Sequence, residues 1–182
     1  GLCLVGSEMC IRDRSRIDIE RNRMDLNKIE IELFKEAIYA TGMKDGNGII
    51  QADACDVSEQ RFAQRIRAAL GEEWNNWEIY AKHKMDSEEI LVGAASILAK
   101  VRRDKEIEKI STTLEIDIGS GYPSDSKTKE AVKELVRNEH PNEYLRWSWA
   151  TVKKAWIKTH GTPIPVRHES SGMVIQSSLN EW

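Results

Sequence analysis

The chain has few cysteines, no long apolar run and no excess of positive charge, and each shortage excludes a class of protein. No stretch of about 18 apolar residues occurs among its 182 residues, which excludes a membrane-spanning helix. Cys3, Cys10 and Cys55 have neither the spacing of a metal site nor an even-numbered disulfide pattern, so we expect a reducing, cytoplasmic location. The net charge of −3 gives the protein as a whole no attraction for nucleic acid, so any such binding must come from local patches.

The composition is that of one folded domain. Hydrophobic residues make up 40% of the chain and charged residues 31%, which argues against a disordered protein, and 182 residues suffice for one sizeable core. Residues 1–15 lack a starting Met, and their short apolar run precedes basic residues, the wrong order for a secretory signal. They resemble translated adapter sequence, so we treat them as a non-native leader and expect that the reading frame was cut before its true start.

One basic patch is visible, in residues 144–168, which contain no acidic residue. Its cations are interleaved with three tryptophans: Arg146, Lys153, Lys154, Lys158 and Arg167 alternate with Trp147, Trp149 and Trp156. Two interpretations stay open. The patch could bind nucleic acid, or it could be an amphipathic helix with a solvated basic face and tryptophans in the core.

The order of the predicted elements indicates an α/β layer followed by a helical C-terminal lobe. We predict a helix that Asn27 caps and Gly42 ends, a strand over 49–53, a helix over 58–70, a strand over 77–82, a long helix over 90–110, and helices over 125–137 and 148–160. Residues 90–99 are apolar nearly all round, which predicts deep burial. Two strands are too few for a stable sheet, so either strands were missed or the chain lacks some that the fold requires.

Two aspartates follow the predicted strands. Asp53 ends the first strand and Asp86 lies just beyond the second, so both carboxylates would meet at one edge if the strands are neighbours. Paired carboxylates suit Mg²⁺ or Mn²⁺, which can support phosphodiester cleavage. The alternative is that both residues are helix caps or turn residues.

Four segments, in order and in register, resemble the signature blocks of the ribonuclease HII family, most closely its archaeal and eukaryotic branch. They are Ala-Asp-Ala-Cys-Asp-Val at 52–57, Lys-His-Lys-Met-Asp at 82–86, Ala-Ala-Ser-Ile-Leu-Ala-Lys-Val at 94–101 and Gly-Ser-Gly-Tyr-Pro-Ser-Asp at 119–125. The resemblance covers about residues 16–160 and is specific because four blocks agree. It implies a ribonuclease H-like mixed sheet flanked by helices, with a helical C-terminal lobe.

The resemblance also implies a function and a site. The family's enzymes cleave RNA in RNA–DNA hybrids and at ribonucleotides embedded in DNA, with Mg²⁺ or Mn²⁺. By this likeness, Asp53 and Asp86 match the third and fourth carboxylates of a four-carboxylate metal site, and Asp56 matches an aspartate outside it that caps the next helix.

Three further residues match family positions that contact nucleic acid. Lys100 and Ser96 match positions near the metal site that contact the backbone, although Ser96 could also be a buried hydroxyl bonded to its own helix. Tyr122 matches the tyrosine that lies against the sugar at the RNA–DNA junction, and it could instead be a loop residue packed on the core.

The chain departs from the family at its first block. The family's Asp-Glu-Ala-Gly-Arg-Gly supplies the other two metal ligands, yet the chain contains no Asp-Glu and no Gly-Arg dipeptide. We therefore expect the 182-residue chain to be inactive. The alternative function is a non-catalytic module that binds nucleic acid or is tethered to a sliding clamp.

The tail, residues 161–182, is predicted to be loose, and its end resembles the peptide by which replication enzymes bind the sliding clamp. Leu179 and Trp182 are three residues apart, so one helical turn would present both to an apolar pocket while Gln176 fills a polar one. The alternative is an ordinary frayed terminus.

Overall fold

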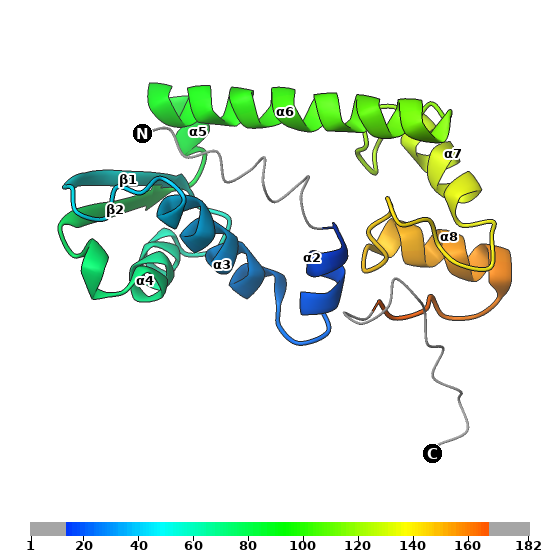
Figure 1. The fold of residues 1–182 in the computed structure, drawn as a ribbon, viewed down its shortest axis with the longest axis horizontal. Helices are drawn as coiled ribbons and strands as arrows, with labels where there is room; N and C mark the ends of the chain where they lie inside the picture. The colour runs from blue at the N-terminus through cyan, green and yellow to red at the C-terminus, as the bar shows by residue number, and fades with distance from the viewer. Residues whose placement is uncertain (1–13, 168–182) are drawn as a thin grey trace, which may run out of the picture. The chain divides into compact units, whose positions relative to one another are not determined.

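The computed structural model describes residues 14–167, which form two compact units (Figure 1). Residues 24–103 make up unit 1, and residues 14–23 with 104–167 make up unit 2. The tail residues Gln176, Leu179 and Trp182, and most of the predicted leader, lie outside the described residues. No helix in the described part of the chain is long and apolar enough to cross a membrane.

The elements run in the predicted order. Their bounds are α2 Arg14–Glu20, α3 Leu26–Tyr39, β1 Gly48–Asp53, α4 Glu59–Leu70, the short 3-10 helix η1 Glu72–Trp74, β2 Trp77–Lys82, α5 Met85–Glu88, α6 Ile90–Leu114, α7 Ser126–Leu135 and α8 Ala150–His160. Both strands and the five longer helices were predicted, most of them to within two or three residues. The short elements α2, η1 and α5 were not, and α2 begins inside the proposed leader.

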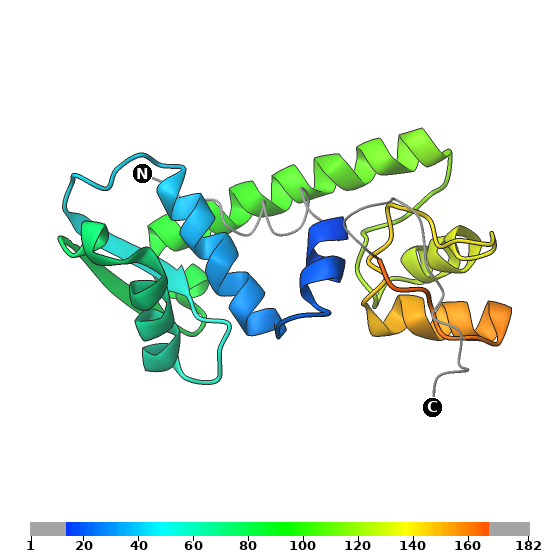
Figure 2. The same cartoon turned by 60° about the horizontal axis from the view of Figure 1, so that its bottom comes forward.

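Unit 1 is built on a parallel pair of strands. β1 pairs with β2 from Gly48 opposite Trp77 to Asp53 opposite Lys82, so the two strands end side by side. Helices α3 and α4 lie next to the sheet and to one another (Figure 2), and Phe34 meets Phe62 edge to face with ring centroids 5.4 Å apart. The sheet of the described residues is thus parallel and two-stranded, whereas the resemblance implied a mixed sheet.

Local capping explains where these helices begin, with one correction. The Asp25 carboxylate, not Asn27, accepts the Lys28 N–H at 2.9 Å, so α3 begins before Asn27, which lies inside the helix. At α4, Ser58 caps the helix, and Gly71 follows its end with a φ of +73°, which a glycine adopts without steric cost.

The predicted deep burial of residues 90–99 is wrong. Ile90, Leu91 and Ile97 are 87%, 63% and 62% exposed, and among the described residues of α6 the buried one is Ile110. The prediction failed because an all-round apolar pattern shows which surface would be favourable to bury, while burial also needs partners on every side. Two strands and the helices beside them do not supply those partners.

Unit 2 is helical. Its core contains Val132 from α7, Val136 just after that helix, Val152 and Trp156 from α8, and Trp147, and α2 lies in the same unit. Trp147 and Trp156 are 6% and 3% exposed, so for these two the core interpretation is confirmed, whereas Trp149 is 37% exposed.

Candidate active site

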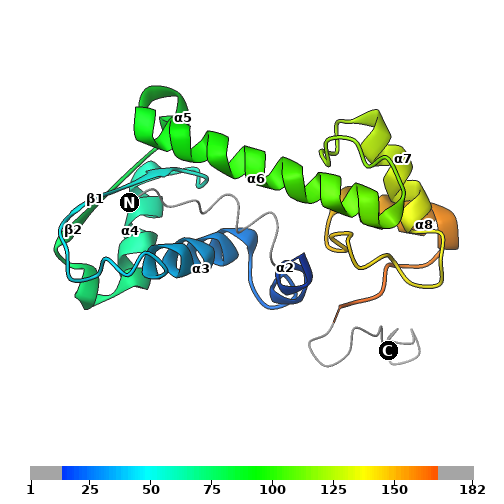
Figure 3. The same cartoon turned by 45° about the horizontal axis from the view of Figure 1, so that its top comes forward.

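The two candidate metal ligands of unit 1 lie at the carboxyl edge of the parallel strand pair. Asp53 is the last residue of β1, and its Oδ1 accepts the backbone N–H of Met85 at 3.0 Å. Met85 begins α5, the four-residue helix that follows β2 and carries Asp86 (Figure 3). The Asp53 carboxylate is therefore bonded to the turn that carries Asp86, which confirms that the strands are neighbours and that both aspartates lie at one edge.

The loops after the two strands are also tied to each other. The Ala54 N–H donates to the Lys82 carbonyl at 3.0 Å, and the Ala54 carbonyl meets His83 Nδ1 at 3.0 Å. The His83 N–H donates to Glu59 Oε1 at 2.7 Å. These bonds join the segment after β1 and the start of α4 to the end of β2 and the segment after it, so Asp53 and Asp86 lie in one hydrogen-bonded network rather than in two separate turns.

The donor set at this edge fits part of a divalent-cation site. Asp53 is exposed and Asp86 half-buried, so both carboxylates are accessible. Within residues 14–167 no group of three His, Cys, Asp or Glu side chains could hold a metal ion together. Two carboxylates nevertheless match the way Mg²⁺ is commonly bound, through one or two carboxylates with waters and substrate phosphates in the other positions.

Asp56 has a different role from the one expected. It is 3% exposed and pairs with Arg61 and with Arg65, the latter at 2.8 Å, while Ser58 caps the helix. The hydrogen bond from Arg61, helped by the charges of both arginines, lowers the pKa of Asp56 to about 2. Through these two ion pairs, Asp56 connects the side of α4 to the loop after β1. The cap prediction was wrong because Ser58, two residues later, occupies the N-cap position.

Ser96 and Lys100 lie one turn apart on α6, so they share a face of the helix. Ser96 is half-buried and Lys100 is exposed. The exposure of Lys100 suits a cation that meets a phosphate, and that role remains a prediction.

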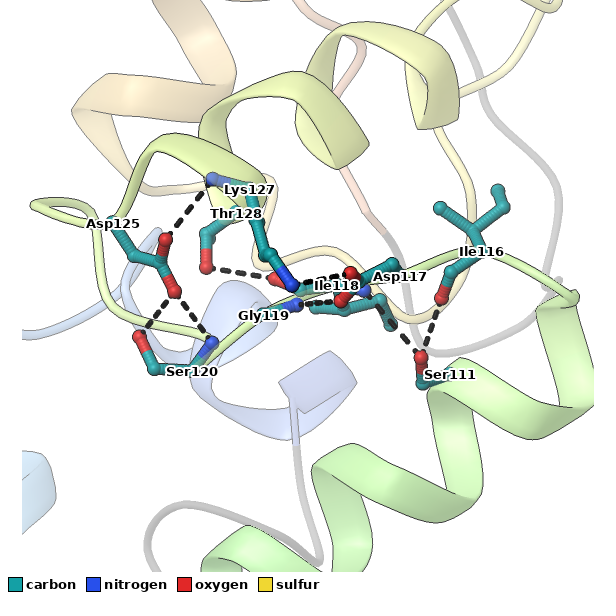
Figure 4. Close-up of polar contacts among 9 residues, drawn as sticks. All are labelled: Ser111, Ile116, Asp117, Ile118, Gly119, Ser120, Asp125, Lys127 and Thr128. Atoms are coloured by element: carbon teal, nitrogen blue, oxygen red, sulfur yellow. Dashed lines mark hydrogen bonds and ion pairs between the residues drawn. The ribbon is translucent and has the colours of Figure 1, made fainter.

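Tyr122 lies in unit 2, in the loop between α6 and α7. Figure 4 shows the hydrogen bonds on either side of Tyr122 in the sequence that hold this loop in one shape. Asp125 Oδ2 accepts both the N–H and the hydroxyl of Ser120, at 2.6 and 2.7 Å, and Oδ1 accepts the Lys127 N–H at the start of α7. Led by the Ser120 N–H, these bonds lower the pKa of Asp125, so its carboxylate stays ionised and bonded well below neutral pH.

A second set of bonds closes the base of the same loop. Thr128, 7% exposed, donates its hydroxyl to the Ile118 carbonyl at 2.8 Å and accepts the Gly121 N–H at 3.0 Å. Gly119 has a φ of +68°, and a Cβ there would lie 2.5 Å from Asp125 Oδ2, so glycine is required. The loop leaves Tyr122 45% exposed, as an aromatic side chain on a rigid support.

Asp18 is an organising residue that the sequence analysis missed. It is 4% exposed, and its two oxygens accept the backbone N–H groups of Trp147 and Ser148, each at 2.8 Å. The signal was present, since Asp18 stands between Ile17 and Ile19 in a short amphipathic run, but its partners are about 130 residues away.

The family model described as Ribonuclease HII matches residues 7–152. The chain belongs to the ribonuclease HII family. It is 40% identical to ribonuclease HII of Methanococcus maripaludis over 158 residues, which are 84% of this chain and 64% of that protein. It is also 40% identical to the Pyrococcus abyssi enzyme over 139 residues, 75% of this chain and 59% of the relative.

Two solved structures share the fold. Ribonuclease H2 from Pyrococcus horikoshii OT3 matches with a TM-score of 0.65 and 33% identity, over 82% of this chain and 67% of that one. Ribonuclease HII in its complex with PCNA from Archaeoglobus fulgidus matches with a TM-score of 0.65 and 31% identity, over 78% and 64%. The predicted ribonuclease HII fold class is confirmed. The chain spans about three fifths of the length of the curated relatives it matches.

Proposed function

We propose that this chain is part of an endoribonuclease that cleaves RNA in RNA–DNA hybrids and at ribonucleotides embedded in DNA, by metal-assisted phosphodiester hydrolysis. The observation that carries the proposal is the bond between the Asp53 carboxylate and the turn that bears Asp86, in a chain of the ribonuclease HII family. The proposal is supported by the position of both aspartates after neighbouring parallel strands, since α/β folds commonly bind ligands at that edge of the sheet.

In this proposal each of the named side chains has a separate role. Asp53 and Asp86 would hold Mg²⁺ or Mn²⁺, and the bound ion would supply activation of a water molecule and stabilisation of charge on the leaving oxygen. Lys100 meets a backbone phosphate as a point charge, and Ser96, on the same face of α6, donates a hydrogen bond to the same backbone. Tyr122 lies against the sugar at the junction of RNA and DNA.

The test compares the chain with a chimera. The 182-residue chain contains no Asp-Glu pair, so we expect no metal-dependent cleavage of a labelled RNA–DNA hybrid. A chimera that carries the N-terminal segment of the Methanococcus maripaludis enzyme before residue 16 should cleave it. A chimera that folds but leaves both the hybrid and DNA with one ribonucleotide intact would instead favour the alternative, a module that binds nucleic acid without catalysis.

Replacing Tyr122 by Ala in the chimera should weaken recognition of the junction more than binding to duplex. The loss of one aromatic contact to the sugar is expected to reduce kcat/KM at a single embedded ribonucleotide by about tenfold, since a stacked contact is worth about 1–3 kcal/mol. Tyr122→Phe is the matched control and should retain most of the rate. Equal losses on the embedded ribonucleotide and in all-DNA binding would refute this role.

We also propose that Gln176, Leu179 and Trp182 bind a sliding clamp. Support comes from the sequence pattern and from the Archaeoglobus fulgidus relative, whose solved structure is a complex with PCNA. A peptide of residues 172–182 should bind an archaeal clamp in calorimetry, and Trp182→Ala should abolish the binding. A peptide that does not bind at millimolar concentration contradicts the proposal.

A further inference from the structure

Helix α6 begins with an apolar stripe that is exposed. Its large side chains are between 47% and 87% exposed, and they are Ile90, Leu91, Ile97, Leu98 and Val101. With Ala94 between them, these positions repeat at three and four residues, the spacing that puts side chains on one side of a helix. At about 3.6 residues per turn they cover an arc roughly 120° wide, centred on Ala94. These six residues are called the α6 stripe.

A different side of the same helix faces α5. A Cβ on Gly93 would lie 2.7 Å from the Asp86 carbonyl oxygen, so this side of α6 lies close to the backbone of α5. Ser96 and Lys100 follow Gly93 at three and seven residues, which puts them on the same side as Gly93. The α6 stripe is therefore separate from the residues proposed to hold the metal and to contact the nucleic-acid backbone.

Charges of opposite sign stand at the two ends of the stripe. Residues 86–89, just before it, read Asp-Ser-Glu-Glu, with three carboxylates and no cation. Residues 100–103, at its far end, read Lys-Val-Arg-Arg, with three cations and no carboxylate. Two copies of the stripe that lie side by side in opposite directions would bring the acidic end of each copy beside the basic end of the other. The surface is therefore complementary to itself.

We infer that the α6 stripe is a self-association surface, through which two copies of the 182-residue chain pair in antiparallel orientation about a two-fold axis. Burial of the apolar side chains drives the pairing, and the charged ends determine its direction. A two-fold contact uses the same patch on both copies, so association ends at the dimer. The pairing needs neither a metal ion nor nucleic acid, so it does not depend on the proposed function.

The charge pattern favours a second copy over two other occupants of the stripe. An anionic membrane would attract the basic end but repel the three carboxylates of residues 86–89. The curated relatives are longer than the part that this chain spans, and a segment of theirs could also cover an apolar surface. A second copy matches the stripe at both ends with charges that this sequence itself contains.

The experiment measures the mass of the 182-residue chain by sedimentation equilibrium, over a concentration range that extends to several times the expected dissociation constant. The double variant Leu91→Gln with Leu98→Gln removes two large side chains from the α6 stripe. The matched control is Ile49→Gln with Ile157→Gln, which removes two large apolar side chains that are 59% and 52% exposed outside the stripe. Circular dichroism and thermal melting establish that both variants are folded.

A single pair of helices buries less surface than a standard protein interface, so we expect a weak dimer with a dissociation constant of about 10–100 µM. The stripe variant should raise this constant at least about tenfold, because each copy loses two side chains that the dimer buries. The control should stay within about twofold of the parent chain. A parent chain that is monomeric at the highest concentration, equal effects of the two double variants, or growth beyond the dimer would overturn the inference.

A charge reversal tests the direction of pairing. Glu89→Lys places a cation at the acidic end of the stripe, where the basic end of the second copy would lie, and should raise the dissociation constant by about threefold. Glu139→Lys makes the same change at an exposed position outside the stripe and should leave the constant within about 1.5-fold of the parent. Equal effects of the two reversals would overturn the antiparallel arrangement.

Two binding measurements decide between the second copy and the other occupants. The 182-residue chain is mixed with phosphatidylserine vesicles, and separately with a peptide of the N-terminal segment of the Methanococcus maripaludis enzyme. We expect neither to bind more tightly than the second copy does. Tighter binding of either one, lost in the Leu91→Gln, Leu98→Gln variant, would assign the stripe to a membrane or to that segment and would overturn the inference.

Discussion

Replacing Asp53 or Asp86 by Asn in the chimera is expected to lower cleavage of an RNA–DNA hybrid by at least about a hundredfold. Changes to groups that only support a metal ligand already cost 10–100-fold, so loss of a ligand's charge should cost no less. Asn keeps an oxygen that can accept the Met85 N–H, so Asp53→Asn retains the bond that joins the two loops while removing the charge. We therefore expect Asp53→Asn to lower the rate of cleavage without changing the fold.

The control for this experiment lies in the same short helix as Asp86. Glu88 is exposed and pairs with Lys82, so Glu88→Gln removes one negative charge from α5 without touching either proposed ligand. It should change the rate less than about threefold, because an exposed ion pair contributes little. The Asp53→Asn, Asp86→Asn double variant should be hardly slower than either single variant, since residues that act as a unit are not additive. Single variants that keep a rate within about fivefold of the parent would remove Asp53 and Asp86 from the site.

Replacing Asp18 by Ala is expected to lower the free energy of unfolding of unit 2 by about 3 kcal/mol. The change leaves the buried N–H of Trp147 and the part-buried N–H of Ser148 without an acceptor, and a buried group of this kind costs about 1–3 kcal/mol. It also removes the carboxylate that lies 4.0 Å from Arg167, itself stacked on the Trp147 ring at 4.4 Å. Urea unfolding followed by tryptophan fluorescence would measure the loss.

Two further variants test this prediction, one with an expected intermediate loss of stability and one as a control. Asp18→Asn keeps one carbonyl oxygen and turns an amide N–H₂ toward the other backbone donor, so it should destabilise the unit, though less than Ala if the side chain can rotate. Glu134→Ala, at an exposed position of α7, should stay within about 0.5 kcal/mol of the parent. A loss under about 1 kcal/mol for Asp18→Ala would show that Asp18 does not hold the 147–148 segment in solution.

Much of the local structure, and the placement of Asp53 and Asp86 at one edge of the strand pair, followed from the sequence by itself. The alternation over 77–82 predicted β2, Asp125 predicted the start of α7, and the spacing of the two aspartates predicted that they would share an edge. These features depend on neighbours a few residues apart, or on the rule that parallel strands end at the same edge, so a linear sequence contains the information. The family followed from four blocks in register for the same reason.

Other features were decided only by tertiary structure. Asp56 lies near Ser58 in sequence, yet its role depends on how α4 turns Arg61 and Arg65 toward it. The apolar start of α6 is exposed because burial needs partners that its own pattern does not specify. Asp18 binds backbone groups about 130 residues away, a distance at which no periodicity connects the two segments. Sequence determines what each residue can bind and which local shape the backbone prefers, while the fold decides which donors, acceptors and surfaces come within reach.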